Sequence, residues 1–155
     1  MYMVREFGND CLLLSVDNIL NFGDLLNIPQ ADEAHRKNTR IEVPLFDKEA
    51  YKEAVVNALL HNHWVEYNAP MFTAYSDRVE ILSRGKMPPG QTIEGFYAGG
   101  SVPVNQKLSD IFLQLHISER SGQGVPSIIS RYGKGAYDFR GNTITVDLSF
   151  DRLDT

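Results

Sequence analysis

The chain has 155 residues, 43% hydrophobic and 23% charged, which is the composition of an ordinary globular protein and not of a disordered one. Its length predicts one domain with a single core. A net charge of −5 and a pI near 5.3 argue against direct binding of DNA or RNA. No apolar run is long enough to cross a membrane, no signal peptide is evident, and the lone Cys11, expected in the core, cannot form an internal disulfide. We therefore expect a cytoplasmic protein without a membrane partner.

Residues 11–27, CLLLSVDNILNFGDLLN, carry apolar side chains at roughly helical spacing. This pattern predicts a helix, although Gly23 is a weak helix former. The polar residues 29–38 predict a connection, so that residues 1–38 form an N-terminal helical segment followed by a link. The alternating residues 39–43 predict a short strand that the following proline ends.

A helix is predicted over residues 47–64, DKEAYKEAVVNALLHNHW, with Asp47 as its N-cap. Glu53, Asn57 and His61 form one i, i+4, i+8 line on it, and the positions around that line are almost all apolar. A helix that is apolar nearly all round is normally buried, so these side chains are expected in a cleft or in the interior. Two interpretations stay open: neighbouring backbone satisfies Glu53 and Asn57, or the two face a ligand and a metal ion.

The middle of the chain begins with two apolar-alternating runs, residues 70–75 and 78–83, which predict a β-hairpin. Residues 84–101 are rich in glycine and proline and predict a long loop, either a functional lid or a disordered segment. Residues 108–117 return to helical spacing.

Towards the C-terminus, the glycine turn at residues 121–124 precedes a short helix predicted to start at Pro126. Residues 136–150 predict a final hairpin around Gly141 and Asn142, with one apolar face. Helices and strands are interspersed without regular βαβ repeats. The predicted fold class is therefore α+β, a two-layer sandwich with helices on one face of a mixed, mostly antiparallel sheet.

Individual motifs give weak chemical signals. Gly122 and Gly124 open a helix, where backbone N–H groups can cradle a phosphate, and a purely structural turn is the alternative. The pattern is neither a P-loop nor a dinucleotide fingerprint. His61 and His63 lack a third nearby ligand, which is poor support for zinc. No serine stands in a G-x-S-x-G motif, so acyl transfer is discarded.

Taken in order, however, these features resemble the nucleotide site of the gyrase, chaperone, histidine kinase and MutL (GHKL) ATPases. More closely, residues 39–150 resemble the C-terminal domain of RecG-like ATP-dependent helicases and transcriptional regulators. The resemblance implies a Bergerat-like ATPase fold, with a divergent GHKL-like nucleotide-binding core at 39–150 within a single domain at 1–155. It rests on residues 53–61 (EAVVNALLH), 77–81 (DRVEI), 85–90 (GKMPPG), 103–105 (PVN) and 119–126 (ERSGQGVP).

The resemblance also implies roles for single residues. Glu53 would orient or deprotonate the water that attacks the γ-phosphate of ATP, and Asn57 would hold a Mg²⁺ ion that bridges the phosphates. Gly122 and Gly124 would let the backbone approach the phosphates. The other nucleotide-binding positions implied are His61, Ser83, Gly85 at the border of the adenine pocket, and Asn105 at the end of a lid over residues 86–105.

Ser83 departs from the pattern of the active ATPases, in which an aspartate accepts the adenine amino proton. Serine offers no charge there, which would weaken adenine binding about tenfold. Relatives usually carry a separate DNA-binding domain, which we expect this chain to lack, so DNA would be contacted only through such a domain. Two functions stay open: a nucleotide-binding domain of a transcriptional regulator with weak Mg-dependent ATP hydrolysis, or a degenerate domain that serves homodimerisation or relays a signal.

Overall fold

The computed structural model describes residues 3–6, 11–28, 30–31, 42–64, 68–100, 102–119 and 122–151. Residues 39–41, which the sequence assigns to a strand, and most of the predicted connection lie outside these ranges. The elements in chain order are β1 (Met3–Glu6), α1 (Leu12–Leu26), β2 (Gln30–Ala31), β3 (Glu42–Val43), α2 (Lys48–His61), β4 (Met71–Ala74), β5 (Arg78–Arg84), α3 (Ile93–Tyr97), α4 (Gln106–Gln114), α5 (Gly124–Tyr132), η1 (Lys134–Ala136), β6 (Tyr137–Arg140) and β7 (Thr143–Ser149).

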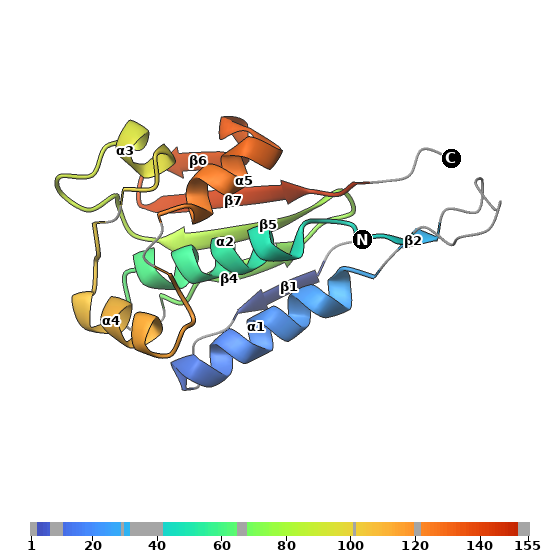
Figure 1. The fold of residues 1–155 in the computed structure, drawn as a ribbon, viewed down its shortest axis with the longest axis horizontal. Helices are drawn as coiled ribbons and strands as arrows, with labels where there is room; N and C mark the ends of the chain where they lie inside the picture. The colour runs from blue at the N-terminus through green and yellow to red at the C-terminus, as the bar shows by residue number, and fades with distance from the viewer. Residues whose placement is uncertain are drawn as a thin grey trace.

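The main sheet has five strands in the order β1-β4-β5-β7-β6, and each neighbouring pair is antiparallel. Helices α1, α2 and α5 lie over one face of this sheet, while α3 and α4 lie toward one end of it (Figure 1). A separate two-stranded ribbon joins β2 to β3. The α+β prediction is confirmed, and within the described residues the main sheet is wholly antiparallel, with no parallel pair.

The two predicted hairpins account for the centre of the sheet. Alternate residues of β5 and of β7 are buried, so each strand turns one face toward the helices. The strands are in register with Ser83 opposite Ile144 and Glu80 opposite Asp147. The first pair lies on the core face and the second on the opposite face.

Helix α2 lies on the sheet between α1 and α5, and it can be buried there because its side chains are apolar nearly all round. Its buried residues are Ala50, Tyr51, Ala54, Val55, Val56, Ala58 and Leu59. Gly23 of α1 leaves room for the Tyr51 ring, since a Cβ at position 23 would overlap that ring. The glycine that weakens α1 as an isolated helix therefore permits its packing against α2.

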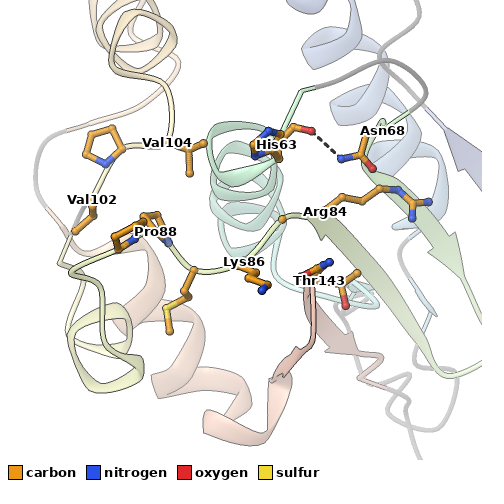
Figure 2. Close-up of a pocket in the computed structure, with 13 residues that line it drawn as sticks. His63, Asn68, Arg84, Lys86, Pro88, Val102, Val104 and Thr143 are labelled. Carbon is orange, nitrogen blue, oxygen red and sulfur yellow. Dashed lines mark hydrogen bonds between the residues drawn. The ribbon is translucent and has the colours of Figure 1, made fainter.

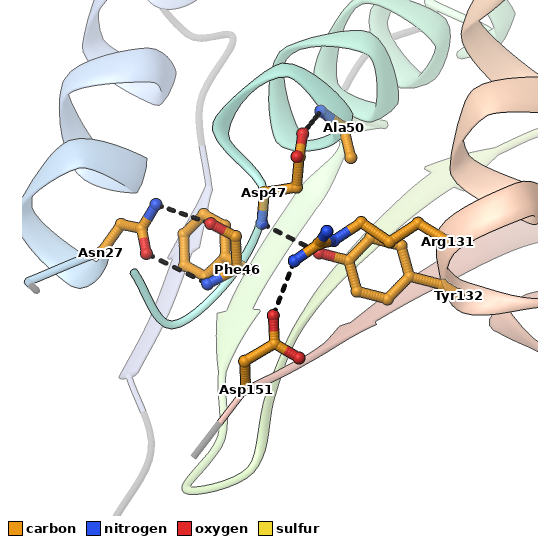
Figure 3. Close-up of polar contacts among 7 residues, drawn as sticks. All are labelled: Asn27, Phe46, Asp47, Ala50, Arg131, Tyr132 and Asp151. Atoms are coloured by element: carbon orange, nitrogen blue, oxygen red, sulfur yellow. Dashed lines mark hydrogen bonds and ion pairs between the residues drawn. The ribbon is translucent and has the colours of Figure 1, made fainter. Parts of the chain in front are cut away.

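The start of α2 is held by its own N-cap and by two neighbouring side chains (Figure 3). The Asp47 carboxylate accepts the Ala50 N–H at 2.7 Å, which confirms the predicted N-cap. The Asp47 N–H donates to the Tyr132 hydroxyl at 2.9 Å, and the Asn27 side chain bonds both backbone groups of Phe46. The first turn of α2 is thus tied to the end of α1 and to the end of α5.

Three predictions of detail were wrong. The loop over residues 84–101 contains helix α3, whose cap Thr92 accepts the Gly95 N–H at 2.9 Å and whose Phe96 is buried. Helix α5 begins at Gly124, so Pro126 occupies its third position. Cys11 is exposed and does not pack in the core.

None of the helices in the described part of the chain has the length and apolar character needed to span a membrane.

Candidate functional site

A cavity of about 420 Å³, here called the α2–α5 cavity, lies between α2 and the start of α5. It brings together five of the predicted site residues: Glu53, Asn57 and His61 from α2, and Gly122 and Gly124 from the glycine turn. Helices α3 and α4 and the segment after α4 complete its walls. The other lining residues are Val56, Leu60, Phe96, Gly99, Gly100, Ser109, Leu113, Ser118, Glu119, Gln123 and Val125.

Glycines determine how closely the walls of this cavity approach one another. A Cβ at Gly124 would overlap the Glu53 carboxylate, so the helix start lies directly against that side chain. Gly99 has φ +85°, and a Cβ there would overlap the carbonyl oxygen of Gly122. The segment after α3 and the glycine turn therefore meet backbone to backbone, which no larger residue allows at this spacing.

The cavity is acidic and partly desolvated. Burial raises the pKa of the Glu53 carboxyl, Lys52 opposes the rise, and the Glu119 and Glu49 carboxylates add to it. Burial lowers the pKa of His61. The described residues give no hydrogen-bond partner to two buried atoms in the cavity wall, His61 Nδ1 and Ser118 Oγ. Unsatisfied buried polar atoms are rare in folded proteins, so these two atoms are exceptions in the wall.

Ser83 does not reach the α2–α5 cavity. It is 4% exposed, and its hydroxyl donates to the Ile144 carbonyl oxygen at 3.3 Å. It lines an internal space of about 20 Å³, enough for roughly one water molecule and too small for a purine. Asn57, His61 and Phe96 border both spaces. The Phe96 ring, which is buried against Tyr137 and Phe139, thus occupies part of the boundary between Ser83 and the cavity.

Two further predicted site residues also lie elsewhere. Gly85, with φ +120°, lines a second cavity at the end of the sheet. Asn105 is the N-cap of α4, where its side-chain oxygen accepts the Leu108 N–H at 3.1 Å, and it borders neither cavity. The structure therefore separates the predicted phosphate-binding residues from those implied for adenine.

Several residues of the cavity wall were not identified from the sequence. Glu119 stands in the quoted ERSGQGVP stretch, so it was within reach of that motif. Phe96 and Leu113 come from α3 and α4, and nothing in their local pattern distinguishes them from ordinary core residues. Their place in the wall depends on how the two short helices pack against α2 and α5.

A Mg²⁺ ion could draw only a few ligands from this cavity. Among the described residues no three His, Cys, Asp or Glu side chains converge to hold a metal. Asn57, whose amide has an oxygen, and Glu53, with its carboxylate, both line the cavity. Such a sparse oxygen set suits Mg²⁺, which usually keeps several waters and binds one or two protein oxygens together with phosphates.

Comparison with known proteins finds a family that part of this chain resembles. Residues 68–139 match a family model described as "Putative ATP-dependent DNA helicase recG C-terminal". This part of the chain is similar to that RecG C-terminal family. The match includes the hairpin, the segment with α3, α4 and the glycine turn, whereas α2 with Glu53, Asn57 and His61 precedes it. The recognition made from the sequence is confirmed over these residues.

A solved structure shares the fold of this chain. The chain is similar to the crystal structure of the DIP2311 protein from Corynebacterium diphtheriae, with a TM-score of 0.67 and 17% sequence identity. The similarity covers 92% of this chain and 30% of that one, so the chain spans less than a third of the neighbour's length. No curated protein matches the chain. At this identity the neighbour shows the fold alone, and it is the family match that indicates an ATPase-like domain of a RecG-like protein.

Proposed function

We propose that the α2–α5 cavity binds a magnesium nucleotide, with ATP as the expected ligand and slow hydrolysis as the expected reaction. The observation that carries the proposal is the meeting of Glu53, Asn57 and His61 with Gly122 and Gly124 around one cavity of about 420 Å³. This volume falls within the range of small-molecule sites, about 300–1,000 Å³.

Each residue has a distinct task in this proposal. The Glu53 carboxylate orients a water molecule and accepts its proton, and a raised pKa favours proton acceptance near neutral pH. The Asn57 amide oxygen offers a ligand to Mg²⁺, and Gly124 allows phosphate oxygens to approach the start of α5. Bound Mg²⁺ supplies neutralisation of the charge that develops on the phosphates.

The charge of the cavity makes the metal essential. Glu53 and Glu119 line it, and the described lining residues include no lysine or arginine. The two carboxylates would therefore repel free ATP. They would repel the magnesium complex less, because it carries less negative charge. Binding should require Mg²⁺, and this requirement distinguishes the proposal from simple attraction of an anion.

The test is calorimetric titration of the whole chain with ATP, with and without Mg²⁺. Asn57→Ala should weaken Mg-ATP binding at least about tenfold, as expected for loss of an interaction with a charged group. Asn21→Ala, on the exposed face of α1, is the matched control and should bind as the unaltered chain does. Equal binding by Asn57→Ala, or no binding by a folded unaltered chain at millimolar Mg-ATP, contradicts the proposal.

Hydrolysis is tested separately with Glu53→Gln. Phosphate release should fall at least about a hundredfold, the contribution typical of a positioned general base, while Mg-ATP binding persists. Glu94→Gln, at an exposed glutamate of α3 that does not line the cavity, should leave both quantities unchanged. If Glu53→Gln hydrolyses ATP at the original rate, the base is another group.

A second function is favoured by the sealed position of Ser83 and by exposed apolar residues near the N-terminus. We infer from these a non-hydrolysing domain that dimerises through β1 and α1. Light scattering should then give a dimer mass that nucleotide does not alter and that Leu25→Glu reduces to the monomer. Leu115→Glu, at an exposed leucine beyond α4, should leave the dimer intact; a monomeric unaltered chain refutes this function. The exposed residues are Met3, Val4, Leu13, Leu14, Leu25 and Ile28.

A further inference from the structure

A second and larger cavity of about 750 Å³, here called the sheet-end cavity, lies beyond the ends of α2 and β5. It shares no lining residue with the α2–α5 cavity. Its walls come from His63 after α2, from Arg84 and Gly85 at the end of β5, and from the β6–β7 turn. The remaining lining residues are Asn68, Lys86, Met87, Pro88, Pro89, Val102, Pro103, Val104, Asn142 and Thr143.

The walls of the sheet-end cavity divide into two chemical halves (Figure 2). Val102, Val104 and Pro88 lie on one side, whereas Arg84, Asn68 and Thr143 lie on the other. The described lining residues include Arg84, Lys86 and His63 but no aspartate or glutamate. The whole chain has a net charge of −5, so the overall charge does not explain why basic residues gather around this cavity.

The polar half is fixed by the protein's own hydrogen bonds. The His63 N–H donates to the Arg84 carbonyl oxygen at 2.6 Å, and the Gly85 N–H donates to the Asn142 carbonyl oxygen at 2.5 Å. The Asn68 amide donates to the His63 carbonyl oxygen at 2.8 Å (Figure 2). A ligand that binds here would not have to order this wall, which favours affinity.

Gly85 is required for this geometry. Its φ of +120° strains any side chain, and a Cβ would lie 3.0 Å from the His63 Cβ. Gly85 therefore lets the end of β5 lie directly against His63. The two proline-containing stretches, residues 86–89 and 102–104, line the cavity beside it. Gly85 thus has a role in shaping this cavity.

We propose that the sheet-end cavity binds a small organic anion with an apolar body. Its carboxylate or phosphate group is held by Lys86, and its body packs against the proline and valine side; the Arg84 guanidinium, which donates to the Ala69 carbonyl oxygen at 3.1 Å, adds positive charge to the polar wall. The volume lies within the range of small-molecule sites. Burying an apolar body supplies binding free energy, while the charged group fixes orientation and specificity.

The experiment is an NMR titration of the isotopically labelled whole chain with phenyl phosphate and, separately, with benzoate. Amide shifts should concentrate at Gly85, Lys86, Asn142 and Thr143. Binding of phenyl phosphate alone assigns the phosphate class, and binding of benzoate alone assigns the carboxylate class. Failure of both probes to bind the folded chain at millimolar concentration overturns the proposal.

Two charge-reversal variants make the assignment specific. Lys86→Glu should lower the affinity for the probe that binds at least about tenfold, because a charge-assisted contact is lost. Lys107→Glu makes the same change of charge at an exposed site on α4 that borders neither cavity, and should bind as before. Equal weakening by both variants indicates general charge attraction and overturns the proposal, as do shifts confined to Gly122 and Gly124.

Discussion

The backbone contact between Gly99 and Gly122 can be tested with two alanine substitutions that differ mainly in steric surroundings. Gly99 and Gly90 have nearly the same φ, +85° and +87°, in the left-handed region. A Cβ at Gly99 overlaps the Gly122 carbonyl oxygen, whereas a Cβ at Gly90 has nothing within 4 Å. Both alanines should share a conformational penalty of roughly 1–2 kcal/mol. Only Gly99→Ala should add an overpacking penalty of about 1–3 kcal/mol, because backbone must separate from backbone.

The measurement is the free energy of unfolding from urea denaturation of the two variants side by side. Gly99→Ala should be less stable than Gly90→Ala by about 1–3 kcal/mol, or by roughly 2–12 °C in melting temperature. Gly122→Ala is less crowded, since its Cβ would lie 3.1 Å from the Gly99 carbonyl oxygen. The double variant at Gly99 and Gly122 should be non-additive, because both substitutions act on one contact. Equal stability of the two single alanine variants, within about 0.5 kcal/mol, refutes the reasoning.

Two other substitutions test contacts away from the cavities. Burial raises the pKa of Glu80, the facing Asp147 raises it further, and Arg78 opposes the rise. The folded state therefore binds a proton more readily than the unfolded chain, and stability falls as pH rises through the interval above the ordinary value of 4.5. Glu80→Gln should flatten that fall and raise the free energy of unfolding at pH 7 by about 0.5 kcal/mol, and an unchanged pH profile would contradict this. Tyr132→Phe should lower the free energy of unfolding by about 1–2 kcal/mol in urea, because the Asp47 N–H loses its acceptor; a loss below about 0.3 kcal/mol would mean that water replaces the hydroxyl.

The sequence predicted elements whose signals are local. Asp47 marks the start of α2, and the C-terminal hairpin follows from the turn at Gly141 and Asn142 together with alternating apolar residues. Helix α3 was missed because its five residues are fewer than two helical turns and lie among glycines and prolines. Its Thr92 cap was present in the sequence, but the glycine content of the surrounding segment gave the stronger signal.

The candidate site was only partly predictable, because local sequence signals determine only part of it. Glu53, Asn57 and His61 share a cavity because one helix spaces them, so periodicity identifies them as a set. The separation of Ser83 from that set could not be predicted, since it depends on the rings of Phe96 and Tyr137 packing from distant elements. Likewise, the exposure of Cys11 depends on how α1 is turned against α2, which its apolar neighbours do not specify.

The segment from Gly85 to Val104 contributes to both cavities, with its two ends in the sheet-end cavity and Phe96, Gly99 and Gly100 in the α2–α5 cavity. A ligand that restrains the ends of this segment also restricts the positions available to its middle. Thermodynamic linkage then makes the effect reciprocal: whatever factor one ligand applies to the affinity of the second, the second applies to the first. A single titration, with one site already filled, would therefore measure the coupling in both directions.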